Sequence, residues 1–401
     1  MKIRVIFFDN FPFFLGKSIR TVHFNGRCGG FSLSGAKNLA GRDPAFASRI
    51  SGVVWTIRFP LFLFPGIIVD SFHFRIGVKR MLSQMVLQWV ELGLIFSIMA
   101  LGVYLTFRIL DFPDLTVDGS FVTGAAVSAT MIYNGYPPAA ATLASLFAGL
   151  LAGCLTGILH TKGKINNLLS GILMMTALYS INLRIMGFTD PNVTSKPNVP
   201  LLNRETVVSQ VESLGNAAGF PWALLVFFLV VTFIFKWMLD WFLKTEIGLA
   251  MRATGDNKRM IRSFSANTDG LIILGLGISN AYVALSGSLF AQYNEFADAG
   301  MGIGMIVVGL ASVIIGEAVV GAKTIARATL AVVIGAILYR IIVGFALKQN
   351  MMDASDMKLI TAAIVVLALI IPGLVEKRRE KRKKAKRNGK RSVRQEEKAN
   401  A

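Results

Sequence analysis

The chain has 401 residues, of which 54% are hydrophobic and only 16% are charged. Soluble domains carry roughly 25% charged residues, so this composition argues against an ordinary soluble domain. Several apolar runs reach about 20 residues, which is the length that an α-helix needs to cross a bilayer. The sequence predicts an all-α polytopic membrane protein, because the short alternating strands of a membrane β-barrel do not stand out.

The net charge of +19 is concentrated at the two ends, in residues 1–80 and 376–401. A basic tail beside an anionic leaflet gains about 1 kcal/mol for each Lys or Arg. No folded basic domain is evident that would carry nucleic-acid binding. The two cysteines cannot form a disulfide framework, and the three histidines are too far apart for a metal site. We therefore expect the lipid bilayer as a partner, with no nucleic acid and no metal.

Residues 1–80 are a poorly patterned N-terminal extension. The apolar stretch 52–69 makes a poor span, since it contains an arginine and two prolines. Met81 opens a cleaner helix, so we expect the functional protein to begin near Met81, with residues 1–80 a disordered extension or a mis-called start. The predicted domains are this extension, a transmembrane domain over residues 81–375 and a basic cytoplasmic tail over residues 376–401.

About eight transmembrane helices can be drawn along the transmembrane domain. They cover residues 86–110, 137–160, 166–188, 220–243, 270–293, 305–321, 326–347 and 358–375. A further apolar piece at 119–135 is shorter and rich in small residues.

Basic residues give the predicted orientation, because Lys and Arg gather at the cytoplasmic ends of spans. The segments 160–164, 244–262 and 323–327 are basic and are predicted to lie inside, together with the C-terminal tail. The segments predicted to lie outside are polar or acidic, namely 189–219, 294–304 and 348–357.

The residues after the first span need a special arrangement. With Lys79 and Arg80 inside, that span runs outward, so residues 111–136 must leave the outer side and return to it. A broken or re-entrant segment over FPDLTVDGSFVTGA would achieve this, and non-helical backbone at such a depth must be buried in protein or line a cavity. The alternative is a ninth crossing with the N-terminus outside, against the local charge bias.

The polar residues of this segment are candidates for a pathway or gate. Asp114, Thr116 and Asp118 alternate, so they share one side of an extended segment, and Gly119 lets the chain turn. Asn280, in the predicted span 270–293, completes the candidate set. An outer loop with an Asx-turn and a helix N-cap is an equally good interpretation of the same residues.

Small residues recur every four positions in the span 137–160, at Ser145, Gly149, Gly153 and Gly157. Such a stripe lets helix backbones approach closely in a membrane, so it predicts helix packing rather than a ligand site.

Ionisable residues within the predicted spans are few. Glu91 and Asp240 are close enough to span ends for their side chains to reach the interface, and Glu317 is near an inner turn. An ion-coupled secondary transporter needs several such groups at mid-depth, so their scarcity argues against that class.

Residues 245–267 form a polar, basic segment between two apolar spans. Thr245 is a good N-cap for a short helix that is expected to end at Gly255, and Asp256 or Asn257 would cap a second helix. Asn267 can take the left-handed conformation. The apolar side chains predicted to enter a groove in a partner protein are Met251, Met260, Ile261 and Phe264. The competing interpretation is an interfacial helix that lies on lipid.

The order of Gly248, Arg252, Ala253, Gly255 and Asn257 resembles the cytoplasmic coupling loop of ABC importer permeases of the branched-chain amino acid and ribose class. In that family the loop docks into an ATPase subunit, and ATP-driven closure of the ATPase dimer moves the spans. The resemblance implies that these five residues couple this chain to an ATPase.

The resemblance runs from about Leu92 to Pro372. GIGMIVVGLASVIIGEAVVGAK at 302–323 resembles the second glycine-rich signature of the class. FPDLTVDGSFVTGAA, followed by KINNLLSGILMMTALYSINLRIMG, resembles more specifically the tryptophan/tyrosine transport permeases.

The resemblance implies a permease subunit that forms the membrane pathway for a small solute, an amino acid or related compound. The sequence contains no nucleotide-binding loop and no catalytic motif, so ATP would be bound and hydrolysed by a partner. The implied assembly is a homodimer or permease heterodimer in the bacterial plasma (inner) membrane, with an extracytoplasmic substrate-binding protein. A simple-sugar ABC permease and an ion-coupled secondary transporter are the alternatives.

Overall fold

The computed structural model describes residues 65–348, except 191–192, 221 and 264–266, together with residue 366. The chain divides into two compact units, with the boundary between Gly77 and Val78. The description below concerns the second unit. The predicted span over 358–375, apart from Val366, and the predicted basic tail lie outside the described residues.

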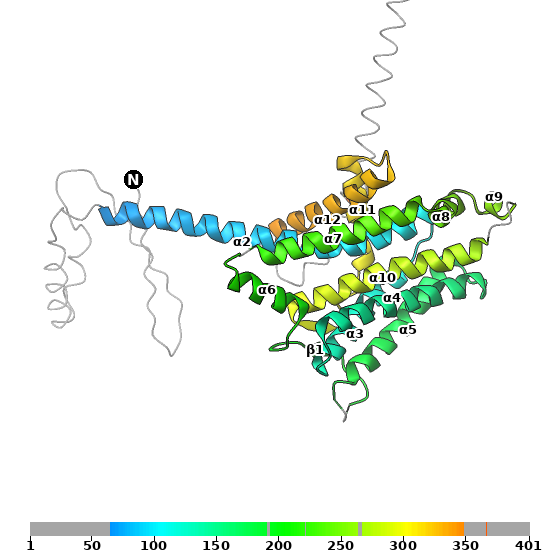
Figure 1. Ribbon diagram of the computed structural model, residues 1–401, viewed down its shortest axis with the longest axis horizontal. Helices are drawn as coiled ribbons and strands as arrows, with labels where there is room; N and C mark the ends of the chain where they lie inside the picture. The colour runs from blue at the N-terminus through cyan, green and yellow to red at the C-terminus, as the bar shows by residue number, and fades with distance from the viewer. Residues whose placement is uncertain (1–64, 191–192, 221, 264–266, 349–365, 367–401) are drawn as a thin grey trace, which may run out of the picture. The chain divides into compact units, whose positions relative to one another are not determined.

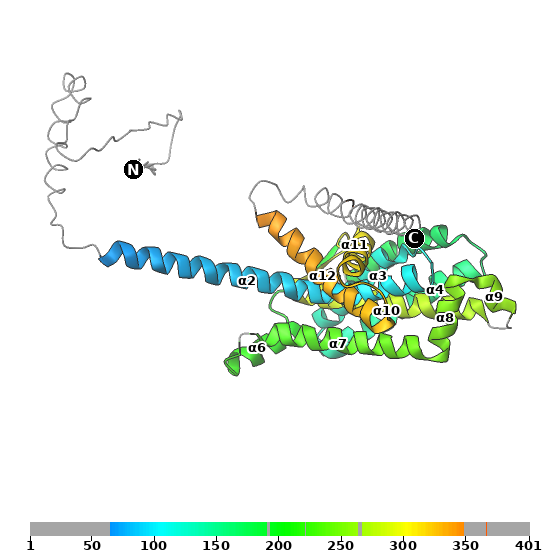
Figure 2. The same cartoon turned by 90° about the horizontal axis from the view of Figure 1, so that it is seen from above.

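The described chain is almost entirely helical (Figures 1 and 2). Its elements are, in chain order, α2 (Pro65–Tyr104), the π-helix η1 (Leu105–Ile109), α3 (Thr116–Tyr133), α4 (Pro138–Thr161), α5 (Asn167–Gly187), β1 (Asn198–Pro200), α6 (Val207–Ala217), α7 (Ala223–Lys244), α8 (Glu246–Asp256), α9 (Lys258–Ser263), α10 (Thr268–Asn294), β2 (Phe296–Asp298), α11 (Met305–Val320) and α12 (Ile325–Lys348). Helix α2 begins before the expected start at Met81, and Pro65 suits its first position because proline lacks the N–H that would be unpaired there.

Six helical segments within the described residues are long and apolar enough to cross a membrane. They are Gln84–Ile109, Pro138–Thr161, Asn167–Gly187, Ala223–Lys244, Thr268–Asn294 and Ile325–Ala346. Each coincides with a predicted span, while the predicted span 305–321 is the shorter apolar helix α11. The chain is therefore an all-α, multi-pass membrane protein.

The described helices form a bundle with two distinct ends, which we call the α8 end and the β1 end (Figure 1). At the α8 end, Gly157 near the end of α4 packs against Ile273 near the start of α10. At the same end, Asp240 near the end of α7 accepts a hydrogen bond of 2.6 Å from Thr329 near the start of α12. The three basic segments predicted to lie inside therefore share one end of the bundle.

The course of α3 contradicts the re-entrant prediction. Helix η1, which continues α2, ends at the α8 end, because the Ile109 carbonyl oxygen packs against Gly255 of α8. From there α3 runs to the β1 end, where the Thr130 hydroxyl donates to the Ile185 carbonyl oxygen at the end of α5 (3.1 Å). The chain over 111–136 thus does not return to the end that it left, and its geometry fits the alternative of a further crossing.

The predicted break between α2 and α3 is present, and it is shorter than expected. Residues 110–115 are non-helical, and Asp111 takes a left-handed conformation with φ 51°. Phe112 and Asp114 are buried within the bundle. Protein packing thus shields this irregular backbone from lipid, as its depth requires.

The two segments predicted to lie outside between residues 189 and 304 meet at the β1 end. Strand β1 pairs antiparallel with β2, with Val199 opposite Ala297. Helix α6 begins at Val207, directly after Thr206, which forms a capping box with Ser209. Val199 and Leu201 are fully buried, so this loop packs onto the bundle.

Glu91 and Asp240 are buried, so the prediction that they reach the interface is wrong. Glu91 accepts a hydrogen bond from the Tyr293 hydroxyl (3.0 Å). Asp240 pairs with Lys236 one helical turn away and accepts from Thr329. Both carboxylates have partners within the bundle, which removes the need to extend toward water.

Candidate pathway and coupling site

A buried polar cluster joins the break before α3 to the middle of α10. One carboxylate oxygen of Asp114 accepts from the Thr116 backbone N–H (2.9 Å), and the other accepts from the Asn280 side-chain amide (2.8 Å). The Thr116 hydroxyl is hydrogen bonded to the Thr156 hydroxyl of α4 (2.9 Å). The first contact is the Asx-turn of the alternative interpretation, yet it lies inside the bundle and not in an outer loop. Three of the five candidate pathway residues, Asp114, Thr116 and Asn280, therefore form one hydrogen-bonded cluster that joins the start of α3 to α10.

Asp118 holds the start of α11. Its carboxylate accepts from the backbone N–H groups of Gly304 (2.9 Å) and Ile306 (2.8 Å). A carboxylate at a helix N-terminus satisfies free N–H groups and interacts favourably with the helix dipole. The first turn of α3 is thereby fastened to α11, far away in the sequence.

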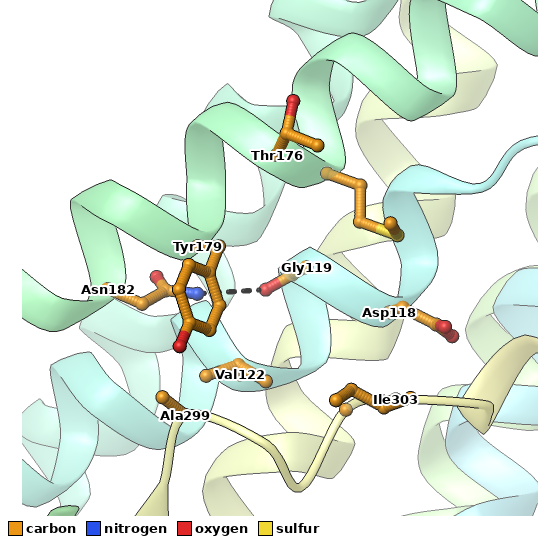
Figure 3. Close-up of a pocket in the computed structure, with 10 residues that line it drawn as sticks. Asp118, Gly119, Val122, Thr176, Tyr179, Asn182, Ala299 and Ile303 are labelled. Carbon is orange, nitrogen blue, oxygen red and sulfur yellow. Dashed lines mark hydrogen bonds between the residues drawn. The ribbon is translucent and has the colours of Figure 1, made fainter. Parts of the chain in front are cut away.

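A pocket of ≈ 260 Å³ lies between α3, α5 and the segment that precedes α11 (Figure 3). Its wall includes Gly119 and Val122 from α3, Thr176, Tyr179 and Asn182 from α5, and Ala299 and Ile303 from the third segment. The Asn182 amide donates to the Gly119 carbonyl oxygen (3.2 Å), shown dashed in Figure 3. Tyr179 and Ile303 are exposed, so the pocket opens onto the surface of the described part of the chain.

Sequence reasoning found Asp118 and Gly119 but missed Asn182. The available signal was a lone asparagine inside an apolar span, because polar side chains in membrane helices commonly face protein. The α3–α5 pairing that brings Asn182 to Gly119 is a long-range contact, and nothing in the local sequence pattern indicates it.

The small-residue stripe of α4 faces α10. A side chain at Gly149 or Gly153 would collide with the carbonyl oxygen of Asn280 or Leu276, respectively. Ser145 is buried and donates to the carbonyl oxygen of Thr142 within its own helix (2.7 Å). The stripe therefore lies at a close contact between two helix backbones, and that contact positions Asn280 beside Asp114.

Helix α8 begins as expected and ends differently. The Thr245 hydroxyl accepts from the Gly248 N–H (3.3 Å), and the Asn257 side chain accepts from the Met260 N–H of α9 (3.1 Å). Gly255 does not end the helix, which continues to Asp256. A side chain at Gly255 would collide with the Ile109 carbonyl oxygen, so close approach to η1 is the physical reason for glycine here. Asn267 is the N-cap of α10 with φ −76°, not a left-handed residue.

The exposed apolar face of α8 and α9 differs from the predicted one. Met251 is fully buried against Gly275, and Ile261 is 8% exposed, so neither can enter a partner's groove. Phe264 lies outside the described residues, and among the three described members of the predicted set only Met260 is exposed. Ile247 and Leu249 of α8 are each about half exposed. Arg252 and Ala253 are half-buried at the edge of this face.

Residues 85–371 match the family described as the branched-chain amino acid transport system / permease component. The chain belongs to this permease family.

Curated relatives of the permease carry more specific descriptions. It is 46% identical over 281 residues to a tyrosine transport system permease protein of Clostridioides difficile, covering 70% of this chain and 88% of that one. It is 34% identical over 284 residues to an uncharacterized protein of Rickettsia prowazekii, covering 70% and 95% of the two chains. It is 23% identical over 288 residues to a ribose import permease protein of Haemophilus influenzae, covering 70% and 80%. No solved structure matches the chain.

Three elements of the permease converge at the α8 end. Gly255 of α8 packs against Ile109 at the end of η1. Arg108, the preceding residue, forms an ion pair with Glu317 in the last turn of α11 (3.1 Å). Helix η1 therefore contacts both α8 and α11 at this end, directly before the break that carries Asp114.

Proposed function

We propose that this permease forms the membrane pathway of an ATP-driven amino-acid importer, and that a separate ATPase subunit binds and hydrolyses the ATP. The tyrosine transport permease, at 46% identity, supports the solute class, while the ribose permease is more distant. The chain itself catalyses no covalent reaction in this proposal and needs no cofactor of its own.

The contact between Gly255 and Ile109 is the observation that carries the coupling role. Helix α8 leaves the side chains of Ile247 and Leu249 about half exposed and packs into the bundle through Met251. Exposed apolar side chains on a short helix fit a groove in a partner protein. We assign the ATPase to this face, with Gly248, Arg252, Ala253, Gly255 and Asn257 as the residues that shape the contact.

The pathway runs along α3 in this proposal. Asp114, Thr116 and Asn280 hold the break before α3 closed, and Asp118 with Gly119 borders the pocket of Figure 3. When the ATPase moves α8, η1 moves with it. The buried hydrogen bonds of Asp114 with Thr116 and Asn280 then break or form again. The two arrangements would be alternative populations that ATP binding favours unequally.

The α8 end faces the cytoplasm in this proposal, because basic residues gather there. The first span then enters from outside, α3 contributes a crossing, and a last span at 358–375 brings the C-terminus into the cytoplasm. The membrane is the bacterial plasma membrane, and an extracytoplasmic binding protein delivers the solute to the β1 end.

A second copy of the chain is proposed to cover α5. Its exposed face carries Thr176, Tyr179 and Ser180 within a span, whereas the exposed face of α7 is apolar. Polar side chains in a span are expensive against lipid and usually face protein or a water-filled cavity. A homodimer through α5 would also close the open side of the pocket.

Uptake into membrane vesicles tests the function. Vesicles that contain the permease, the ATPase that copurifies with it and the binding protein are expected to accumulate labelled L-tyrosine when ATP is supplied on the α8 side. Uptake should survive ionophores that collapse ion gradients. Uptake that follows an ion gradient and ignores ATP would refute the proposal.

A further inference from the structure

Asn182 carries a buried acceptor atom that the described residues leave without a partner. Its residue surface is only 1% exposed, and its Oδ1 atom has no hydrogen bond. The assignment of nitrogen and oxygen follows from the neighbour, since the Gly119 carbonyl can only accept and so requires the Asn182 amide nitrogen. The oxygen is therefore left over, and an unpaired buried acceptor costs free energy unless something donates to it.

The surroundings of Asn182 indicate what the donor is. Asn182 lines the pocket of Figure 3, whose wall is otherwise mostly apolar and includes Val122, Met175, Tyr179 and Ile303. Among the ten residues that line this pocket, Asp118 is the one with an acidic or basic side chain, and that side chain is a carboxylate. An acidic neighbour and a free acceptor together favour a cationic donor over an anion.

We propose that Asn182 is a specificity-determining residue that accepts a hydrogen bond from the α-ammonium group of the transported amino acid. This rests on the proposed function of an amino-acid pathway. The apolar side chain of the solute, of aromatic or large aliphatic size, lies against Tyr179, Met175 and Ile303. The bond to Gly119 holds the Asn182 amide in place in the wall of the pocket.

Two substitutions separate this role from a structural one. Asn182→Leu removes both the donor to Gly119 and the free acceptor, whereas Asn182→Asp removes only the donor and keeps an acceptor. We expect ATP-driven uptake of labelled L-tyrosine to fall about tenfold in Asn182→Leu, the order expected for losing one buried hydrogen bond to a charged group. Asn182→Asp should retain most of the uptake. If the bond to Gly119 were all that mattered, the two variants would lose uptake equally.

The experiment uses the permease reconstituted with its ATPase and saturating binding protein, and the thermal stability of each variant is measured beside uptake. Asn216 of α6 is exposed, and Asn216→Leu serves as the matched control with unchanged uptake expected. The assignment of Asn182 alone would be overturned if the wild type transports and Asn182→Leu transports equally well. It would also be overturned if the wild type transports and both Asn182 variants lose the same share of uptake. Absence of ATP-dependent uptake of any amino acid by the wild type would overturn the proposed function and this inference with it.

Discussion

At the residue scale, the most informative side chain is the fully buried carboxylate of Asp114. Burying an anion is costly unless hydrogen bonds replace its water, and Asp114 receives two from Thr116 and Asn280. Asn280 in turn also donates to the Leu276 carbonyl oxygen within its helix (2.9 Å). The pair thus specifies one register between the start of α3 and α10.

A double-mutant cycle measures how strongly the pair is coupled. We expect Asp114→Ala and Asn280→Ala each to lower the free energy of unfolding by about 1–3 kcal/mol, because each removes one hydrogen bond from the buried group that remains. The double variant should lose less than the sum of the two, with a coupling of about 0.5–3 kcal/mol. Unfolding of the purified protein in mixed micelles gives all three values. Strictly additive losses would mean that the contact does not stabilise the fold.

Sequence reasoning succeeded at some residues and failed at others for a physical reason. Thr245 was predictable as a cap because a cap depends on the next three residues only. The buried state of Glu91 and Met251 was not predictable, because it depends on Tyr293 and Gly275 in another helix.

At the element scale, the contact between α4 and α10 organises the bundle. Backbone approaches at Gly149 and Gly153 leave no room for a side chain. Lipid tails are as apolar as leucine, so close van der Waals packing is a main source of helix association in a membrane. The stripe was visible in the sequence as a repeat of small residues, whereas its partner helix was not.

Filling that contact should destabilise the bundle. Gly153→Leu is expected to lower the free energy of unfolding by at least about 1–3 kcal/mol, since overpacking forces the two helices apart. Ala140→Leu, on an exposed part of the same helix, is the matched control and should have little effect. Thermal unfolding of both variants in one detergent compares them. Equal stability would show that α4 does not need its close approach to α10.

The topology of α3 shows the limit of charge patterns at this scale. Runs of apolar residues located six spans correctly, because the length required to cross a bilayer is a local property. The direction of the first span was inferred from Lys79 and Arg80, which placed its beginning at the same end as residues 244–262, whereas the contact of Ile109 with Gly255 places its other end there. A packing contact fixes the relative direction of two helices, whereas the charge rule is a statistical bias.

At the scale of the whole molecule, the exposed face of α8 should determine assembly with the ATPase. Ile247→Glu or Leu249→Glu places a charge in the proposed apolar contact and is expected to weaken ATPase binding at least about tenfold, or about 1.4 kcal/mol. Leu202→Glu changes an equally exposed leucine at the β1 end and should leave binding unchanged. Pull-down of the ATPase at graded concentrations measures the effect. Unchanged binding by both α8 variants would remove the partner from this face and favour a helix that lies on lipid.

The proposed dimer through α5 predicts where two copies can be cross-linked. In a background without Cys28 and Cys154, Ser180→Cys should form a disulfide-linked dimer on oxidation, because the same face meets itself across a two-fold axis. Leu229→Cys on α7 lies at a similar distance along its helix from the β1 end and faces outward, so it controls for random collisions in the membrane. Non-reducing gels of membranes before solubilisation compare the two variants. Cross-linking of Leu229→Cys but not of Ser180→Cys would place the second copy elsewhere, and the hydroxyl groups of α5 would then need another cover within the bilayer.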